Sequence, residues 1–435
     1  MKINKLAIPL MLNNITSMVI TLCDQAMIGR TYMEGFASVG IIGNNIYEIT
    51  GVLGAISIGL NIVGSRAKGK NDIENLNNSL CSNLLNSLII GVIFTTLSLI
   101  FGKSVLQNIF NLKDNTLIDS VKYLNIFSLS LGINLIIFNL SSYFKIIGET
   151  KFILYGGIIS CTSNVLLDYI LIFGKLGFPA LGIKGNAIGS VLSLILCVLY
   201  YLIVIKKFKL IKKTKIKLFK NTKEIFSISI PIMLQEFIES TLLVFVMTYI
   251  LAQIGLLEVA VYNLLFNIIN IALMPMYAYG QVALTLVSEE FGANNISKIQ
   301  TIINSCIKRP MYIYIIFCSI IIIFKNSIPK ILTNDYEVIS MSSKYMFILV
   351  IANFMNIPKT ILTYSLQALN KEKLVFAYSS VISIISMVLI YLLVKLTNLK
   401  LNSIYLGNMI CYTILSLFLY KEFIKFKAIT FKYHK

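Results

Sequence analysis

Tryptophan is absent from this sequence of 435 residues, and histidine occurs once, at His434. A metal site or catalytic dyad built on two histidines is therefore excluded. The seven cysteines are scattered without CxxC spacing, and we interpret them as small buried apolar residues. Acidic residues are also few, with 19 Asp and Glu against 38 Lys and Arg. No nucleophile–base pair or metal cluster is apparent, so we do not expect an enzyme.

Apolar residues, by contrast, make up 57% of the chain, and the mean hydropathy is +0.81. A membrane-spanning helix needs about 20 consecutive apolar residues, whereas a membrane β-barrel shows alternation over segments of about ten residues. The continuous apolar runs predict an all-α membrane protein with twelve transmembrane helices. We place these spans near residues 6–29, 36–64, 79–101, 121–148, 152–174, 182–205, 226–250, 257–287, 307–332, 341–368, 374–395 and 403–420.

Lysine and arginine lie between the apolar runs, and their distribution is uneven. The termini and the loops that follow even-numbered spans hold 26 of the 38 basic residues, and the other loops hold 11. The densest block is 206–223, with nine lysines. Because cytoplasmic loops carry the excess of Lys and Arg, we expect both termini on the cytoplasmic side of the cell membrane. The net charge of +19 then reflects topology and contact with anionic lipid rather than nucleic-acid binding.

Three landmarks recur at an offset of 222 or 223 positions, which indicates an internal repeat of six spans. They are Pro9 and Pro231, the loops 65–73 and 288–296, and the loops 148–151 and 370–373. Because six is even, both copies enter the membrane in the same direction, and we expect two pseudo-symmetric six-helix lobes about a central cavity. The predicted division is an N-lobe over 1–205, a basic linker over 206–223, a C-lobe over 224–425 and a cytoplasmic tail over 426–435.

Four carboxylates interrupt the apolar runs: Asp24, Asp168, Glu236 and Glu239. A charge at bilayer depth is unfavourable by about 3 kcal/mol or more, so such residues usually face a cavity and mark an ion or substrate path. Asn164 lies four positions before Asp168, so both project from one face of a helix. Together with Asp24, they suit a hard cation such as Na⁺, or the two acids share a proton. The alternative is a hydrogen-bonded cluster that only joins helices.

The second half carries a basic residue within a span as well. Lys359 lies deep in the tenth span, and a lysine at that depth needs a partner, for which Glu239 or Glu236 is the natural choice. A purely structural ion pair is the alternative. Asn139, like other polar residues within spans, either lines a polar cavity or bridges helices. No loop is long enough for a nucleotide-binding domain, so uphill transport would depend on an ion gradient.

Several segments together resemble the MATE (multidrug and toxic compound extrusion) family. Segments 6–9 (LAIP) and 23–30 (CDQAMIGR) are similar to the family's LAIP…VDTxxVGR. Segment 147–151 (IGETK) is similar to GxGDTK, segment 164–174 (NVLLDYILIFG) to NxxLDxxxIFG, and segment 182–190 (GIKGNAIGS) to GxxGAAxAT. The resemblance extends over the whole chain.

This resemblance implies two six-helix lobes and a secondary antiporter that exports organic cations in exchange for Na⁺ or H⁺ by alternating access. Carried over by motif, Asp24, Asn164, Asp168 and Ser190 would form the ion site of the N-lobe. Asp24 and Asp168 would be the metal ligands if the ion is Na⁺. Ser190 stands where the family usually has Thr, and it keeps the hydroxyl group.

In the C-lobe, Glu239 matches an acidic position on the seventh helix of one branch of the family. That branch often has an Asp on the tenth helix, where this chain has Asn356, with Lys359 three residues on. A second ion site is therefore not carried over. We instead expect Glu239, Glu236, Asn139, Lys359 and Asn356 to line the route of the cargo.

Two alternatives remain open. One is a lipid-linked oligosaccharide flippase of the related superfamily, although such proteins usually have more spans and a more basic cavity. The other is a membrane receptor or scaffold, which needs neither a buried acid pair nor a repeat. The expected partners are a small, cationic substrate and the lipid bilayer, without nucleic acid. We expect a monomer that uses no cofactor apart from the coupling ion.

Overall fold

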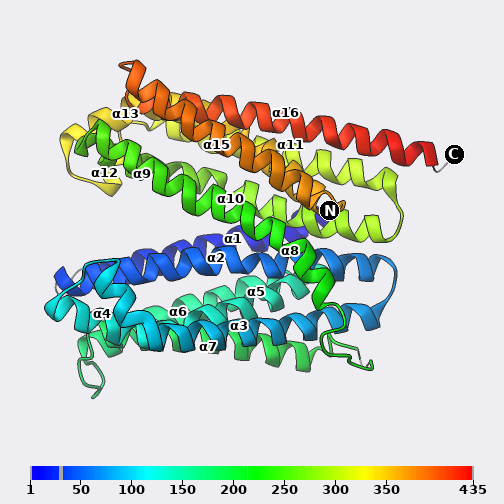
Figure 1. The fold of residues 1–435 in the computed structure, drawn as a ribbon, viewed down its shortest axis with the longest axis horizontal. Helices are drawn as coiled ribbons and strands as arrows, with labels where there is room; N and C mark the ends of the chain where they lie inside the picture. Colours follow the sequence, from blue (N-terminus) through cyan, green and yellow to red (C-terminus); the bar gives the residue numbers. More distant parts are fainter. Residues whose placement is uncertain (1, 29–32, 213, 434–435) are drawn as a thin grey trace. The chain divides into compact units, whose positions relative to one another are not determined.

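The computed structural model describes residues 2–28, 33–212 and 214–433. Arg30 and His434 lie outside this part of the chain. The described residues form helices and connecting turns with no strand, which confirms the all-α prediction (Figure 1). The helices are α1 Lys2–Ile28, α2 Met33–Gly69, α3 Ile73–Asn108, α4 Asp114–Phe127, α5 Leu129–Ile147, α6 Lys151–Phe173, α7 Ile183–Lys207, α8 Thr222–Glu236, the π-helix η1 Phe237–Leu242, α9 Leu243–Ile254, α10 Leu256–Gly292, α11 Ile296–Ile323, α12 Ile328–Leu332, α13 Tyr336–Phe354, α14 Asn356–Ala368, α15 Glu372–Leu396 and α16 Leu401–Tyr433.

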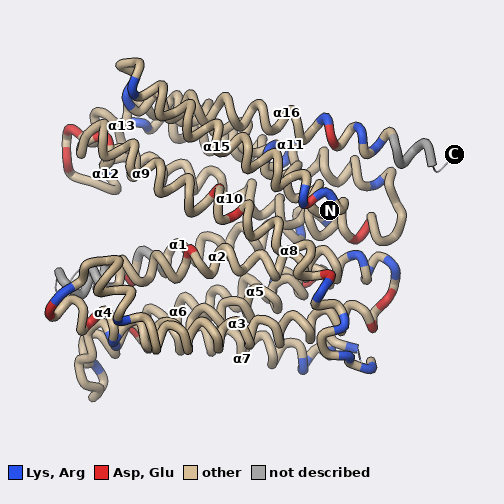
Figure 2. Tube along the Cα trace, in the orientation of Figure 1, with Lys and Arg blue, Asp and Glu red and all other residues tan. Residues whose placement is uncertain are grey.

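Twelve helical segments of the described chain are long and apolar enough to cross a membrane, as the sequence predicts. Figure 2 shows Lys and Arg mainly near the helix ends. The ninth span differs from its prediction, because α11 covers Ile296–Ile323 rather than 307–332. The missed first turns, residues 296–306, carry polar side chains such as Lys298, Gln300 and Asn304, so an apolar run does not reveal where the helix begins.

The fourth and tenth spans, which correspond in the repeat, each consist of two helices. Helices α4 and α5 are separated at Ser128, and α13 and α14 at Met355. Pro358 follows the second break and has no amide hydrogen to donate to a carbonyl of the preceding turn. The break lies directly before α14, the helix that carries Lys359.

Contacts divide the chain into two compact units. The N-unit is Asn4–Met233, and the C-unit is Leu234–Lys435 with the first three residues. The boundary falls inside α8, so the basic linker 206–223 belongs to the N-unit. Within the N-unit, α2 and α3 pack against α5, and α6 packs along α7. The exact limits of the predicted lobes remain a prediction.

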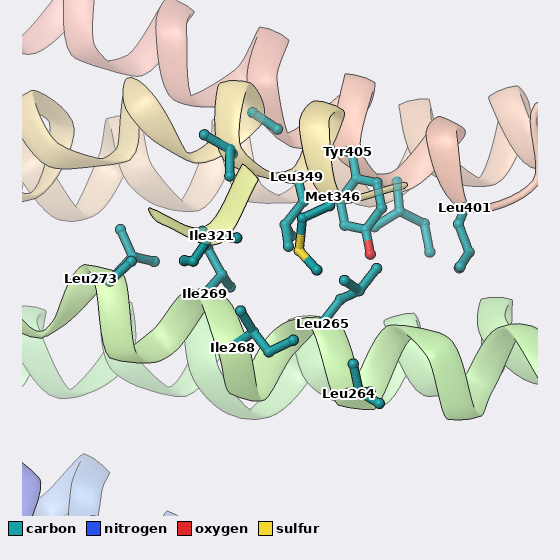
Figure 3. Close-up of a cluster of buried hydrophobic side chains, with 14 of the residues drawn as sticks. Leu264, Leu265, Ile268, Ile269, Leu273, Ile321, Met346, Leu349, Leu401 and Tyr405 are labelled. Carbon is teal, nitrogen blue, oxygen red and sulfur yellow. The ribbon is translucent and has the colours of Figure 1, made fainter. Parts of the chain in front are cut away.

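The C-unit has an apolar core that is built largely on one face of α10 (Figure 3). Leu265, Ile269 and Leu273 follow one another at intervals of four, and this spacing places them on a single helical face. Met346 from α13 and Tyr405 from α16 pack against this face. The same core includes Ile357 of α14, the helix that carries Lys359.

Hydrogen bonds with polar residues of α3 attach the basic linker to the N-unit. Asn77 Nδ2 donates to the carbonyl oxygen of Lys212 at 2.8 Å and to Thr214 Oγ1 at 2.9 Å. Farther along, Asn221 Nδ2 donates to Ser79 Oγ at 2.6 Å. The described lysines of the linker therefore lie on a segment that is held against α3.

Candidate functional site

Helices α6 and α7 of the N-unit carry three of the four residues predicted to bind an ion. Two glycines of α7 allow these helices to approach closely. A Cβ atom on Gly185 would lie 2.6 Å from the carbonyl group of Leu171, and one on Gly189 would lie 2.2 Å from Oδ1 of Asp168. The Asp168 side chain is therefore held against the backbone of α7, where Asp168 is 0% exposed.

Polar side chains of the two helices meet at this contact. Asn186 Nδ2 donates to Asp168 Oδ2 at 2.6 Å, and Asn164 Nδ2 donates to Ser190 Oγ at 3.3 Å. The structure thus brings together Asn164, Asp168 and Ser190. Asn186 is absent from the predicted site. The sequence could have indicated Asn186, because this polar residue lies four positions before Ser190 and therefore on the same helical face.

Asp24 of α1 reaches the same place. Its carboxyl group and that of Asp168 lie within hydrogen-bonding reach of each other. Two carboxylates this close strongly disfavour both being ionised unless a proton or a cation is shared between them. Moreover, Oδ1 of Asp24, Oδ1 of Asn164 and Oδ1 of Asp168 are buried without a hydrogen-bond donor. Carboxylate and amide oxygens of this kind are the ligands that hard cations prefer.

Two tyrosines stand beside the carboxyl pair. The ring of Tyr47, from α2, meets Phe127 edge-on with ring centroids 5.7 Å apart, and Tyr123, from α4, stacks on Phe127 at 4.9 Å. Both phenol groups lie close enough to Asp24 and Asp168 to interact with their charge. The sequence gives no signal for Tyr47, because its place depends on how α2 packs.

In the C-unit, Lys359 of α14 forms an ion pair with Glu239 of η1. Lys359 Nζ donates to Glu239 Oε2 at 2.7 Å, and the two side chains are 12% and 20% exposed, respectively. This confirms the predicted pairing of Lys359 and identifies Glu239 as the partner. Gln235 Nε2 donates to the other oxygen, Oε1, at 2.9 Å. π-Helical turns of this kind are frequent at functional sites.

Glu236 and Asn356 lie close to this pair along the chain but make other contacts. Glu236 is part-buried in the last turn of α8, and Tyr364 lies within electrostatic range of both Glu236 and Glu239. The amide oxygen of Asn356 accepts a hydrogen bond from Thr360 Oγ1 at 3.3 Å. A role for either residue along the route of a cargo stays a prediction.

Asn139 bridges α3 and α5 inside the N-unit, and it is 1% exposed. Its Nδ2 donates to Ser87 Oγ at 2.7 Å, and its Oδ1 accepts from Asn83 Nδ2 at 2.7 Å. Of the two interpretations left open by the sequence, these contacts favour a bridge between helices. No contact with a cargo is needed to account for this residue.

Comparisons with known proteins agree with this arrangement. The family model MatE matches the chain twice, over residues 9–170 and 231–392. The two matches begin 222 positions apart, which is the offset of the predicted repeat. The chain is 26% identical over 344 residues to the probable multidrug resistance protein NorM of Thermotoga maritima, which is 78% of this chain and 73% of that protein. It is 23% identical over 341 residues to the multidrug export protein MepA of Staphylococcus aureus, with 78% and 74% covered.

A solved structure shares the fold over nearly the whole chain. It shows the outward-facing conformation of a multidrug resistance MATE family transporter. The TM-score is 0.87 at 18% sequence identity, and the superposition covers 98% of this chain and 96% of the other. At this identity the similarity concerns the fold alone.

Proposed function

Because this chain belongs to the MATE family of membrane transporters, we propose that it is a secondary antiporter that exports drug-like organic cations in exchange for Na⁺ or H⁺. Two of its relatives are a probable multidrug resistance protein and a multidrug export protein, which supports a small drug-like cargo. The distribution of Lys and Arg supports a place in the cell membrane with both termini cytoplasmic. We further propose that a single chain is the transporting unit.

The observation that carries this proposal is the carboxyl pair of Asp24 and Asp168. One oxygen of each acid and the neighbouring amide oxygen of Asn164 are buried without a hydrogen-bond donor. If the coupling ion is Na⁺, Asp24 and Asp168 supply carboxylate oxygens, and Asn164 adds an amide oxygen. If the ion is H⁺, the two carboxyl groups share it. In both cases binding neutralises the repulsion between the acids.

The two acids belong to different helices, so an ion between them links α1 to α6. Release of the ion restores the repulsion, which favours movement of α1 away from α6. Pro9 lies inside α1, where the missing amide hydrogen removes a helical hydrogen bond and provides a place to bend. We propose that this movement of α1 couples ion binding to alternating access for the cargo.

Transport in liposomes tests this function. The purified protein is reconstituted, and the uptake or release of ethidium, a fluorescent cation, is followed while a Na⁺ gradient or a pH gradient is imposed separately. We expect one of the gradients to drive ethidium against its own gradient, in the opposite direction to the ion. Ethidium movement that is the same with both gradients and with neither would contradict antiport.

A further inference from the structure

Glu239 of the C-unit differs from Asp24 and Asp168 of the N-unit, because its carboxylate is already paired with a lysine. Among the described residues, neither Asp24 nor Asp168 forms an ion pair with Lys or Arg, whereas Lys359 Nζ lies 2.7 Å from Glu239 Oε2. The repeat offset of 222 positions places Glu239 opposite Ser17 and Lys359 opposite Ile137. The charged pair is therefore a feature of the C-unit alone.

A series of hydrogen-bonded polar side chains orients the carboxylate of Glu239 through the oxygen that Lys359 does not contact. Gln367 Nε2 donates to Gln235 Oε1 at 3.1 Å, and Gln235 Nε2 donates in turn to Glu239 Oε1 at 2.9 Å. Gln235 is also within 3.4 Å of Ser379 Oγ. The carboxylate is thus oriented by neutral donors, and its second oxygen is left to a cation.

Aromatic rings complete the surroundings of this carboxylate. The Lys359 ammonium lies 5.9 Å from the ring centroid of Tyr412, which is within the range of a cation–π interaction. Tyr364 and Tyr277 lie within electrostatic range of Glu239. The ring of Tyr364 packs directly against Gly280, since a Cβ atom on that glycine would lie 2.6 Å from the ring. A carboxylate together with tyrosine rings is the chemistry by which proteins bind organic ammonium groups.

We propose that Lys359 is a built-in competitor, whose ammonium occupies the carboxylate of Glu239 that a cationic cargo binds. This inference rests on the proposed function, because it assumes that the cargo is a cation. Cargo binds by displacing Lys359 from Glu239, so the strength of this internal pair sets the affinity for organic cations. Lys359 therefore sets how tightly the site holds a cationic cargo.

The geometry allows this exchange. Both side chains of the pair are partly accessible, at 12% and 20%, and a lysine side chain has four flexible carbon atoms. The displaced ammonium keeps the ring of Tyr412 as a neighbour. Because one cation replaces another at Glu239, the carboxylate is never left uncompensated, which would be the unfavourable state.

Equilibrium binding of ethidium to the purified protein in detergent tests the inference without any gradient. If Lys359 leaves Glu239 free in only about a tenth of the molecules, ethidium binds about tenfold more weakly than it binds to a site without Lys359. We therefore expect Lys359→Met to bind ethidium about tenfold more tightly than the wild type. Lys359→Arg, which keeps the charge, should bind as the wild type does, and adding Glu239→Gln to Lys359→Met should abolish the gain.

Lys359→Gln is neutral but still able to donate to Glu239, so it gives the same readout if Lys359→Met does not fold. Unchanged or weaker binding by a folded neutral variant would overturn the inference. This outcome is distinct from failure of the proposed antiport. Tighter binding by Lys359→Met without gradient-driven transport would refute antiport alone, and gradient-driven transport with unchanged binding would refute the competitor alone.

Discussion

Gly189 lies directly against the carboxylate of Asp168. A Cβ atom at this position would be 2.2 Å from Asp168 Oδ1 and 3.2 Å from its backbone nitrogen. Both distances are shorter than a normal contact, and the backbone atom cannot rotate away. The absence of a side chain at position 189 is therefore a condition for the present place of the acid between α6 and α7.

We expect Gly189→Ala to reduce ion-driven ethidium export at least about tenfold, because the added methyl group displaces the acid from Asn186 and Asp24. Overpacking should also lower the free energy of unfolding by about 1–3 kcal/mol. Transport in liposomes and the melting temperature measure the two effects. Gly51→Ala is the matched control, since a Cβ on that helical glycine meets no atom within 4 Å. An equal loss of export in both variants would show that Gly189 has no special role.

Asp24→Asn and Asp168→Asn should each abolish ion-coupled export while the protein remains folded. Asparagine keeps the shape of the side chain but neither carries the negative charge nor accepts a proton at neutral pH. The measurement is gradient-driven ethidium transport, with size-exclusion chromatography as the check on folding. Asp119→Asn is the control, because Asp119 forms an exposed pair with Lys122 on α4. Normal export by either test variant would remove that residue from the mechanism.

The pair of Lys359 and Glu239 should behave as a coupled unit in thermal unfolding. Lys359→Met leaves the carboxylate without its cation and should lower the melting temperature, and the further change Glu239→Gln should restore much of the loss. Residues in contact typically show a coupling of about 0.5–3 kcal/mol in such a cycle. Lys344→Met, at an exposed lysine of α13, should have little effect. Strictly additive changes would mean that the pair contributes nothing to stability.

An epitope tag inserted after Lys215 should be reachable only from the cytoplasmic side, because the linker 206–223 is the most basic loop. The measurement is antibody binding to intact cells and to inside-out vesicles. A tag after Asn398, in the loop that follows the eleventh span, should show the opposite pattern. Antibody binding to the first tag on intact cells would reverse the proposed orientation.

The spans and the repeat can be predicted from the sequence because both depend on local properties. Apolar runs predict the spans, and recurring loop residues predict the offset. The start of the ninth span is the exception, since the polar residues Lys298, Gln300 and Asn304 occupy its first turns. The grouping of Asn164 with Asp168 also follows from helical spacing, and the partner of Lys359 follows from the need to compensate a charge within a span.

Features that depend on which helices face one another could not be predicted. Asn139 and Asn164 look alike in the sequence, yet the first bridges two helices and the second has an amide oxygen without a donor. Nothing local assigns the bond from Asn186 to Asp168 or the position of Tyr47. These contacts follow from the close approach of α6 to α7 and from the packing of α2.

The π-helical turn η1 has a mechanical consequence for the seventh span. A π-helical turn holds one more residue than an α-helical turn, and one residue corresponds to a rotation of about 100° around the axis. Shifting this extra residue along the helix would turn Glu239 about the axis without unfolding either α8 or α9. A change of helical register in the seventh span would therefore alter the direction in which Glu239 faces Lys359.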